Sequence, residues 1–246
     1  MRFHKITLDD KPAFDRIMHN RVYEACEYRF SHLYIWKDAD NIKICIEGDT
    51  IYICECNIGG CMMPVTSDIV SAFVNIERYY EEAGEPFRVY GVTKEAAEEL
   101  RKTGRYNIEE MRDLYDYLYS AEDIITLKGK RFHSKRNHIS KFKELYNYEF
   151  KPMQSSDISE CIEMEMEWAK KHGDEGTVYD EKSAIKNAIY NMEKLELSGG
   201  VIRVDNRLAA FTIGQATGSG MGIVHFEKAD TDYAGIYTAL NQMYAE

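Results

Sequence analysis

The spacing of apolar residues in the first half of the chain predicts alternating short strands and helices. Apolar and polar residues alternate on both sides of Glu47-Gly48-Asp49, which is typical of a β-hairpin. After Ser67, apolar residues recur at helical spacing as far as Ala83. The expected strands are 2–7, 42–47, 50–56, 61–65, 87–91, 106–109 and 114–119, and the expected helices are 9–18, 20–26, 67–83 and 94–103, while 29–36 fits either type.

The second half shows the same pattern in a shorter form. Ser155, Ser156 and Asp157 favour a helix N-terminus, and Asp205-Asn206-Arg207 is a turn signal between two apolar runs. The expected strands are 148–152, 199–205, 208–215 and 221–227, the expected helices are 155–172, 181–197 and 232–246, and the expected loops are 173–180 and 217–220.

The shared order of elements indicates two similar units in tandem. We expect an α+β fold with mixed sheets, made of a first unit at 1–122, a basic linker helix at 123–146 and a second unit at 147–246. The second half has no counterpart to residues 84–119. Since a final helix without a following strand leaves a sheet edge exposed, we expect the second unit to be incomplete at its C-terminus, after its third helix.

The composition is that of a globular protein. A chain of 246 residues can form one large domain or two of about 120 residues each. It has no apolar run of the roughly 20 residues that span a bilayer, and its start, MRFHKITLDD, is not a signal peptide. We therefore expect a cytoplasmic protein whose six cysteines are reduced. The spacing of Cys54, Cys56 and Cys61 favours buried small side chains over a metal site, so no metal is expected.

A basic run interrupts this acidic chain. The net charge is −11, yet residues 124–143 contain no Asp or Glu. Their positive charges come from Lys128, Lys130, Arg131, Lys135, Arg136, Lys141 and Lys143. Such a cluster focuses a positive potential and favours an anionic partner, although a solvated helix face would have the same composition.

Four stretches carry a family resemblance: EYRFSHLYIWKD, GKRFHSKRNHISKF, GGVIRVDNRLAAFTIG and HFEKADTDYAGIYTALNQ. With the element order, they make the whole chain resemble the C-terminal domain of phosphatidylglycerol lysyltransferase, a family with the acetyltransferase-like (GNAT) fold. The resemblance implies two GNAT-like units in tandem, and the best understood relatives transfer an aminoacyl group from aminoacyl-tRNA to a lipid or peptidoglycan precursor. The lipid-modifying relatives carry an N-terminal membrane domain, which this sequence lacks, so a lipid acceptor is not implied.

The sequence of the turn that would bind the donor phosphates does not identify the donor. GNAT enzymes that use acyl-CoA usually hold its pyrophosphate with the pattern Q/R-x-x-G-x-G/A. The matching stretch here is EKADTDYAGIY, in which only Gly235 fits, and PVTSDIV in the first unit has no glycine. Helix N-termini bind phosphate without such a signature. Acyl-CoA and aminoacyl-tRNA are therefore both candidate donor substrates, and no tightly bound cofactor is expected.

The densest ionisable cluster at an expected strand end consists of His225, Glu227, Lys228 and Asp230. On a strand, His225 and Glu227 share one face and Lys228 lies on the other. His225 or Glu227 could deprotonate an attacking group, and Lys228 could stabilise an oxyanion. Surface ion pairs and a core histidine are the alternative. Tyr237 and Asn241 share one face of the last helix and could contact substrate or simply pack.

The basic run supplies the candidate donor-binding residues, which are Lys130, Arg131, His133, Lys135, Arg136, Asn137 and His138. Lys135 and Arg136 would lie in the first turn of a helix, where cations oppose the helix dipole unless an anion is bound. The run also links the two units, and clefts between domains are favoured ligand sites. A linker helix with solvated lysines is the alternative.

These features predict a transferase. It would move an acyl or aminoacyl group from a phosphate-bearing donor, either aminoacyl-tRNA or acyl-CoA, to an amine or hydroxyl acceptor by direct attack. The alternative is a GNAT-like module without catalysis that binds an RNA end or a nucleotide through the basic cleft. The expected partner is a small-molecule or tRNA donor in the first case and an RNA end in the second.

Overall fold

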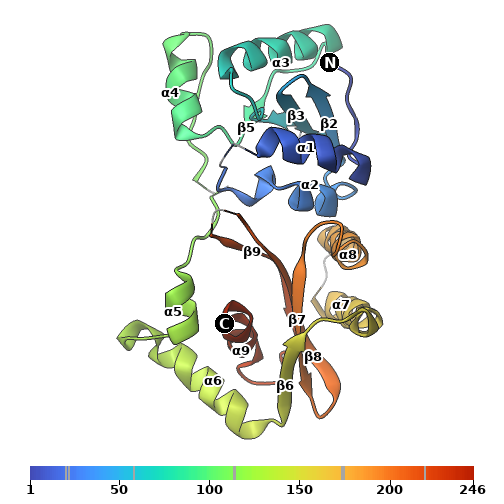
Figure 1. Cartoon of the computed structure of the whole chain (residues 1–246), viewed down its shortest axis with the longest axis vertical. Helices are drawn as coiled ribbons and strands as arrows, with labels where there is room; N and C mark the ends of the chain where they lie inside the picture. Colours follow the sequence, from blue (N-terminus) through green and yellow to red (C-terminus); the bar gives the residue numbers. More distant parts are fainter. Residues whose placement is uncertain (20, 22, 58, 113–114, 173–174, 219) are drawn as a thin grey trace. The chain divides into compact units, whose positions relative to one another are not determined.

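The chain divides into two compact units, Met1–Asp116 and Tyr117–Glu246 (Figure 1). The computed structural model describes residues 1–19, 21, 23–57, 59–112, 115–172, 175–218 and 220–246. Each unit packs helices on its own β-sheet, so the fold is α+β as predicted. The basic run expected to be a linker lies within the second unit. Over the described ranges, no helix is both long and apolar enough to cross a bilayer.

The first unit is built on a mixed sheet in the order β1-β2-β3-β4-β5. Neighbouring strands are antiparallel except for β4 and β5, which are parallel. The helix α3 is capped by Asp68, which accepts a hydrogen bond from the N–H of Ser71, and it ends at Gly84 in a left-handed conformation. The strands are β1 (His4–Lys5), β2 (Ile42–Glu47), β3 (Thr50–Glu55), β4 (Gly60–Met62) and β5 (Val89–Tyr90), and the helices are α1 (Lys11–Met18), α2 (Phe30–Trp36), α3 (Ile69–Ala83) and α4 (Lys94–Lys102).

Some expected elements of the first unit are wrong. Neither 106–109 nor the described part of 114–119 is a strand, and residue 114 lies outside the described residues. Tyr106 packs on the rings of Phe73 and Phe87, so its apolar character serves aromatic packing instead of strand pairing. The ambiguous stretch 29–36 forms α2. The described residues of 20–26 do not form an α-helix, and residues 20 and 22 lie outside them.

Cys54 and Cys61 form a disulfide, so the expectation of six reduced cysteines is wrong for this pair. In the antiparallel pairing of β3 with β4, Cys54 lies directly opposite Cys61, which brings the two sulfur atoms together. Both side chains are buried. The cysteines at 26, 45, 56 and 161 are free thiols.

The second unit has its sheet between two layers of helices (Figure 1). The sheet is antiparallel in the order β6-β7-β8-β9. One face is covered by α7 (Ile158–His172) and α8 (Glu175–Tyr190), and the other by α5 (Ala121–Thr126), α6 (His133–Leu145) and α9 (Ile236–Ala245). Ile139 and Phe142 of α6 pack with Leu240 of α9 in the core. The strands are β6 (Tyr148–Pro152), β7 (Ser198–Val204), β8 (Arg207–Ala216) and β9 (Gly222–Ala229).

The loop expected at 173–180 is wrong from Glu175 onward, because α8 begins there, while 173 and 174 lie outside the described residues. The glycines and acids of this stretch signalled a loop. Such preferences amount to about 1 kcal/mol or less per residue and are readily overridden by tertiary context. The turn expected at 217–220 joins β8 to β9, and its residue 219 is likewise undescribed.

An ion-pair network fastens the start of α7 to the sheet. Arg203 on β7 donates to Asp157 at 2.8 Å and to Glu160 at 2.6 and 3.0 Å. Burial alone would raise the pKa of Asp157, but the hydrogen bond from Arg203 holds it below its ordinary value. The folded state therefore favours the ionised carboxylate. This contribution to stability is present above the ordinary pKa of Asp and is lost as the pH falls through the lowered value.

Replacing Arg203 with Met should lower the free energy of unfolding by about 2 kcal/mol, since it removes the nearest cation of the buried Asp157 carboxylate and leaves Lys151 at 4.0 Å. Urea unfolding at neutral and at acid pH measures the effect, and the loss should shrink in acid. Arg105→Met is the control, because the side chains of its ion pair with Glu77 are 50% and 27% exposed, and such a pair should contribute less than about 1 kcal/mol. Equal losses in the two variants would contradict the role of the network.

Candidate functional site

The strand β9 places two of the predicted catalytic side chains on opposite faces of the sheet. Glu227 lies opposite Thr212 of β8 and faces α9. Lys228 points to the other face, toward α7 and α8. This is the alternation expected of a strand. The register of β9 shifts next to His225, so simple alternation does not define the face of that residue.

Lys228 is buried among opposite charges. Its side chain is 5% exposed, and its Nζ lies 2.8 Å from Glu181 Oε2 and 3.5 Å from Glu165 Oε2. The same ammonium lies 3.6 Å from the ring centroid of Trp168, a cation–π contact. Burial raises the pKa of Glu165, which Lys228 lowers in part. The geometry therefore favours a structural cation between β9 and the α7–α8 layer.

The surroundings of Glu227 change the pKa of its carboxyl group. Its Oε1 accepts a hydrogen bond of 3.1 Å from Asn241 Nδ2. Burial raises the pKa of Glu227, and the Asn241 hydrogen bond and the charge of Lys135 offset only part of this rise. A carboxylate whose pKa is raised toward neutrality is a better proton acceptor than an ordinary surface one.

One face of α9 carries a polar stripe, Tyr237, Asn241 and Tyr244, at the spacing of adjacent helical turns. Tyr244 was not predicted. Its hydroxyl lies 2.9 Å from Ser198 Oγ and 3.2 Å from the Ser198 carbonyl oxygen, to which it donates. Burial raises the pKa of Tyr244, and the Glu227 carboxylate adds to the rise. The regular spacing of the three residues is the sequence signal that would have found it.

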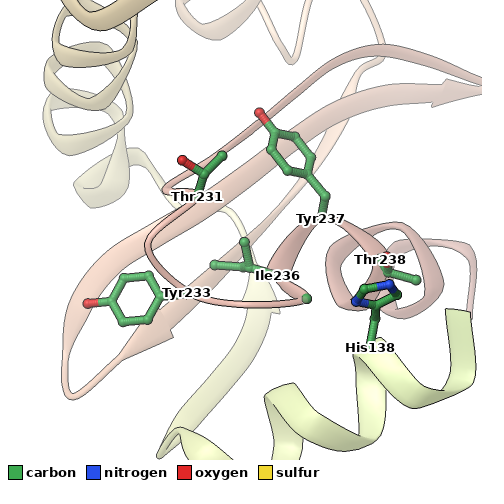
Figure 2. Close-up of a pocket in the computed structure, with 7 residues that line it drawn as sticks. His138, Thr231, Tyr233, Ile236, Tyr237 and Thr238 are labelled. Atoms are coloured by element: carbon green, nitrogen blue, oxygen red, sulfur yellow. The ribbon is translucent and has the colours of Figure 1, made fainter. Parts of the chain in front are cut away.

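A pocket of about 250 Å³ lies at the N-terminus of α9 (Figure 2). Figure 2 shows His138 of α6 beside Thr238 of α9. Most of the lining side chains carry hydroxyls, and Gly235 forms the end of the helix with φ +88°. A Cβ on Gly235 would lie 2.3 Å from the His138 carbonyl oxygen, so only glycine permits this approach of the two helices. The pocket is lined by His138, Thr231, Tyr233, Gly235, Ile236, Tyr237 and Thr238.

Along both α6 and α9, a residue that lines the pocket lies about one helical turn from a residue that interacts with Glu227. On α9, Tyr237 lines the pocket and Asn241, four residues later, binds Glu227. On α6, His138 lines the pocket, and the charge of Lys135, three residues earlier, lowers the pKa of Glu227. Such pairs lie about 5–6 Å apart on a helix. Five predicted site residues therefore gather in one region of the second unit.

The other residues of the basic run have different surroundings. Arg136 donates to the backbone carbonyls of Leu127 and Gly129, and so holds the turn after α5. Arg131 pairs with Asp123 and lies over the ring of Phe132. His133 and Asn137 are within hydrogen-bond distance of each other on the exposed side of α6. Lys130 is exposed at the turn before α6.

Asp230 shapes the turn that leads to α9. Its Oδ1 accepts a hydrogen bond from the N–H of Asp232 at 3.1 Å, and its carbonyl accepts one from Tyr233. This side chain therefore sets the path of the backbone into the pocket.

Among the described residues, one group has ligand atoms close enough to hold a metal ion. Cys26, Glu27 and Asp116 of the first unit bring these atoms within 4.8 Å of one another. Burial raises the pKa of the Cys26 thiol, and the two carboxylates raise it further. The Cys26 Sγ lies 3.6 Å from a carboxylate oxygen of Glu27 and 3.8 Å from one of Asp116, so the thiol is within hydrogen-bond distance of both carboxylates.

Comparison with solved structures agrees with this fold. A conserved protein of unknown function from Bacteroides thetaiotaomicron is 30% identical, with a TM-score of 0.86, and the match covers 100% of this chain and 86% of that chain. The C-terminal domain of a protein described as a lysylphosphatidylglycerol synthetase, from Agrobacterium fabrum, is 13% identical, with a TM-score of 0.63 over 96% of this chain and 73% of that chain. Among curated proteins, none matches the sequence significantly.

The match to a family model covers most of the chain and includes the whole second unit. The model describes the C-terminal part of phosphatidylglycerol lysyltransferase and matches residues 21–246. The α+β architecture of both units is consistent with the GNAT-like fold expected from the sequence motifs. The chain belongs to the phosphatidylglycerol lysyltransferase C-terminal family.

Proposed function

We propose that this protein transfers an acyl or aminoacyl group from a phosphate-bearing donor to an amine or hydroxyl acceptor. The family match suggests an aminoacyl transfer role. The observation that carries the proposal is the position of Glu227, a partly buried carboxylate with a raised pKa, held by Asn241 one helical turn from the pocket.

The donor phosphate would lie at the N-terminus of α9. Free backbone N–H groups there attract anions, and Thr231, Thr238 and His138 offer further hydrogen bonds in the pocket. Lys135, one turn from His138, adds positive charge. Aminoacyl-tRNA and acyl-CoA both present a phosphate some distance from a reactive carbonyl, so both fit this arrangement.

Glu227 would act as the general base. The acceptor's amine or hydroxyl attacks the donor carbonyl carbon and forms a new amide or ester bond, while its proton passes to Glu227. The bond from the carbonyl carbon to the donor oxygen or sulfur breaks, and the leaving group departs as a hydroxyl or thiol after taking up a proton. Asn241 keeps the carboxylate aimed during this exchange.

The second candidate is a module that binds an RNA end or a nucleotide without transfer. The exposed side chains of Lys130, Lys135, Lys141 and Lys143 favour it, because clustered cations attract a phosphate backbone.

Turnover separates the two candidates. The full-length protein is incubated with radiolabelled aminoacyl-tRNA or acyl-CoA pools and a lysate fraction of small amines and lipids. We expect one donor to be consumed by the wild-type protein and not by the Glu227→Gln variant. Salt-sensitive binding with no donor consumed would overturn the transferase and support the binding module.

A further inference from the structure

Thr212 on β8 carries a hydroxyl group that is buried without a partner. Its side chain is 0% exposed, and among the described residues its Oγ1 makes no hydrogen bond. A hydroxyl buried in this way costs free energy, and valine would fill the same space without that cost. A buried polar group of this kind therefore calls for a role other than packing in the core.

The strand register places Thr212 beside Glu227. The two residues lie directly opposite each other on β8 and β9, so their side chains share one face of the sheet and their Cβ atoms are about 4.5–5.5 Å apart. On its other side, Thr212 lies opposite Gly200 of β7, which has no side chain. Glu227 is therefore the cross-strand neighbour that can interact with the Thr212 hydroxyl.

The Glu227 carboxylate can accept a second hydrogen bond. Asn241 donates to its Oε1, and no other side chain in the described part of the chain donates to this group. The amide nitrogen of Asn241 can only donate, whereas a threonine hydroxyl both donates and accepts. After a rotation about its Cα–Cβ bond, the Thr212 hydroxyl can donate to the ionised carboxylate and accept from the protonated one.

We propose that Thr212 is a positioning residue for Glu227, and that its hydroxyl holds the second carboxyl oxygen before and after Glu227 takes up the proton of the acceptor. This inference rests on the proposed transfer reaction, in which Glu227 is the base, and Thr212 itself forms no covalent bond. A hydrogen bond to a charged group is roughly twice as strong as one between neutral groups. The Thr212 hydroxyl therefore favours the ionised form of Glu227.

A carboxyl titration tests this role without the transfer reaction. Protein labelled with ¹³C at the glutamate carboxyl carbon is titrated by NMR, and the signal that Glu227→Gln removes is that of Glu227. We expect Thr212→Val to raise the pKa of Glu227, because it removes a donor to the ionised form. Thr212→Ser keeps the hydroxyl and should match wild type. The titratable groups that interact with Glu227, Lys135 of α6 and Tyr244 of α9, are present in every variant of Thr212.

Stability and rate give a second measurement. Thr212→Val should unfold at the same or a higher urea concentration, since the hydroxyl that it removes has no partner. Its transfer rate should nevertheless fall by about 10- to 100-fold, because the base is less well positioned. Thr50→Val is the matched control, since the Thr50 hydroxyl on β3 lies 2.9 Å from Thr66 Oγ1. It should unfold at a lower urea concentration and leave the Glu227 pKa and the transfer rate unchanged.

An unchanged Glu227 pKa in Thr212→Val would overturn the positioning role and leave the proposed transfer reaction standing. A loss of stability as large as that in Thr50→Val would also overturn it, by showing that the Thr212 hydroxyl serves the fold. Wild-type protein that consumes no donor would overturn the transfer reaction instead, and the titration would then decide the role of Thr212 by itself.

Discussion

Replacing Glu227 with glutamine should slow the transfer reaction by about 10²- to 10⁴-fold, the usual contribution of a general base. Glutamine keeps the shape of the side chain and can still accept the hydrogen bond from Asn241, but it cannot take a proton. The expected loss is therefore in kcat, with little change in the KM of the donor. Single-turnover rates with the donor identified by the consumption assay provide the measurement.

The pH profile supplies an independent check. Because burial raises the pKa of Glu227, the acid limb of the wild-type rate should lie above the ordinary glutamate pKa of about 4.3, and the limb should vanish in Glu227→Gln. The pH dependence of stability has the opposite sign to that of the rate. The folded state holds the proton more tightly than the unfolded chain, so stability falls as the pH rises through the raised pKa. At neutral pH the variant should unfold at the same or a higher urea concentration.

An acid limb that persists unchanged in Glu227→Gln would assign the base to another residue. Asn241→Ala is the positioning variant, since it removes the donor to Glu227 and leaves the carboxylate in place. It should raise the apparent pKa of the acid limb, because the hydrogen bond lowers the pKa of Glu227. A lower rate with an unshifted limb would point to a packing role for Asn241.

Replacing Gly235 with alanine should destabilise the second unit by about 3 kcal/mol. The new Cβ would lie 2.3 Å from the carbonyl oxygen and 3.0 Å from the carbonyl carbon of His138. These are backbone atoms, so α6 or α9 must shift, at a cost of about 1–3 kcal/mol. The left-handed φ of +88° adds about 1–2 kcal/mol for a residue with a side chain. The shift should also distort the pocket and weaken donor binding.

Gly84→Ala is the matched control for this effect. Gly84 also has a left-handed backbone, with a φ of +69°, but nothing lies within 4 Å of its added Cβ. It should lose only the backbone part, about 1–2 kcal/mol, and keep the donor affinity of wild type. Thermal unfolding and donor titration of both variants give the comparison. Equal losses in the two variants would show that the α6–α9 approach is not the cause.

The sheet of the second unit was predictable because its short apolar runs are separated by clear turns. The alternation of successive side chains along a strand predicted that Glu227 and Lys228 point to opposite faces. It did not predict the partners of Lys228, because Glu165 and Glu181 come from helices that only the tertiary fold brings to β9. At 106–109 the predicted strand is absent. Its Tyr106 packs on the rings of Phe73 and Phe87 instead of lying in a strand.

The basic run was the clearest signal in the sequence, but charge alone could not rank its members. Arg136 looked like an anion ligand and instead binds two backbone carbonyls, a contact set by the turn after α5. Lys135 and His138 face the α9 side because they share a helix face with Ile139 and Phe142, which pack in the core. Helical periodicity could have made that distinction, and the position of α9 could not be known without the fold.

The strand β9 packs on different helices through its two faces, and this matters for how substitutions affect the protein. Substitutions around Lys228 alter the packing of β9 on α7 and α8, while those around Glu227 alter its contacts with α9 and α6. The two side chains have separate partners on opposite faces of the sheet. Stability and the proposed transfer reaction can therefore be varied from opposite sides of a single strand, which makes β9 a suitable starting point for engineering.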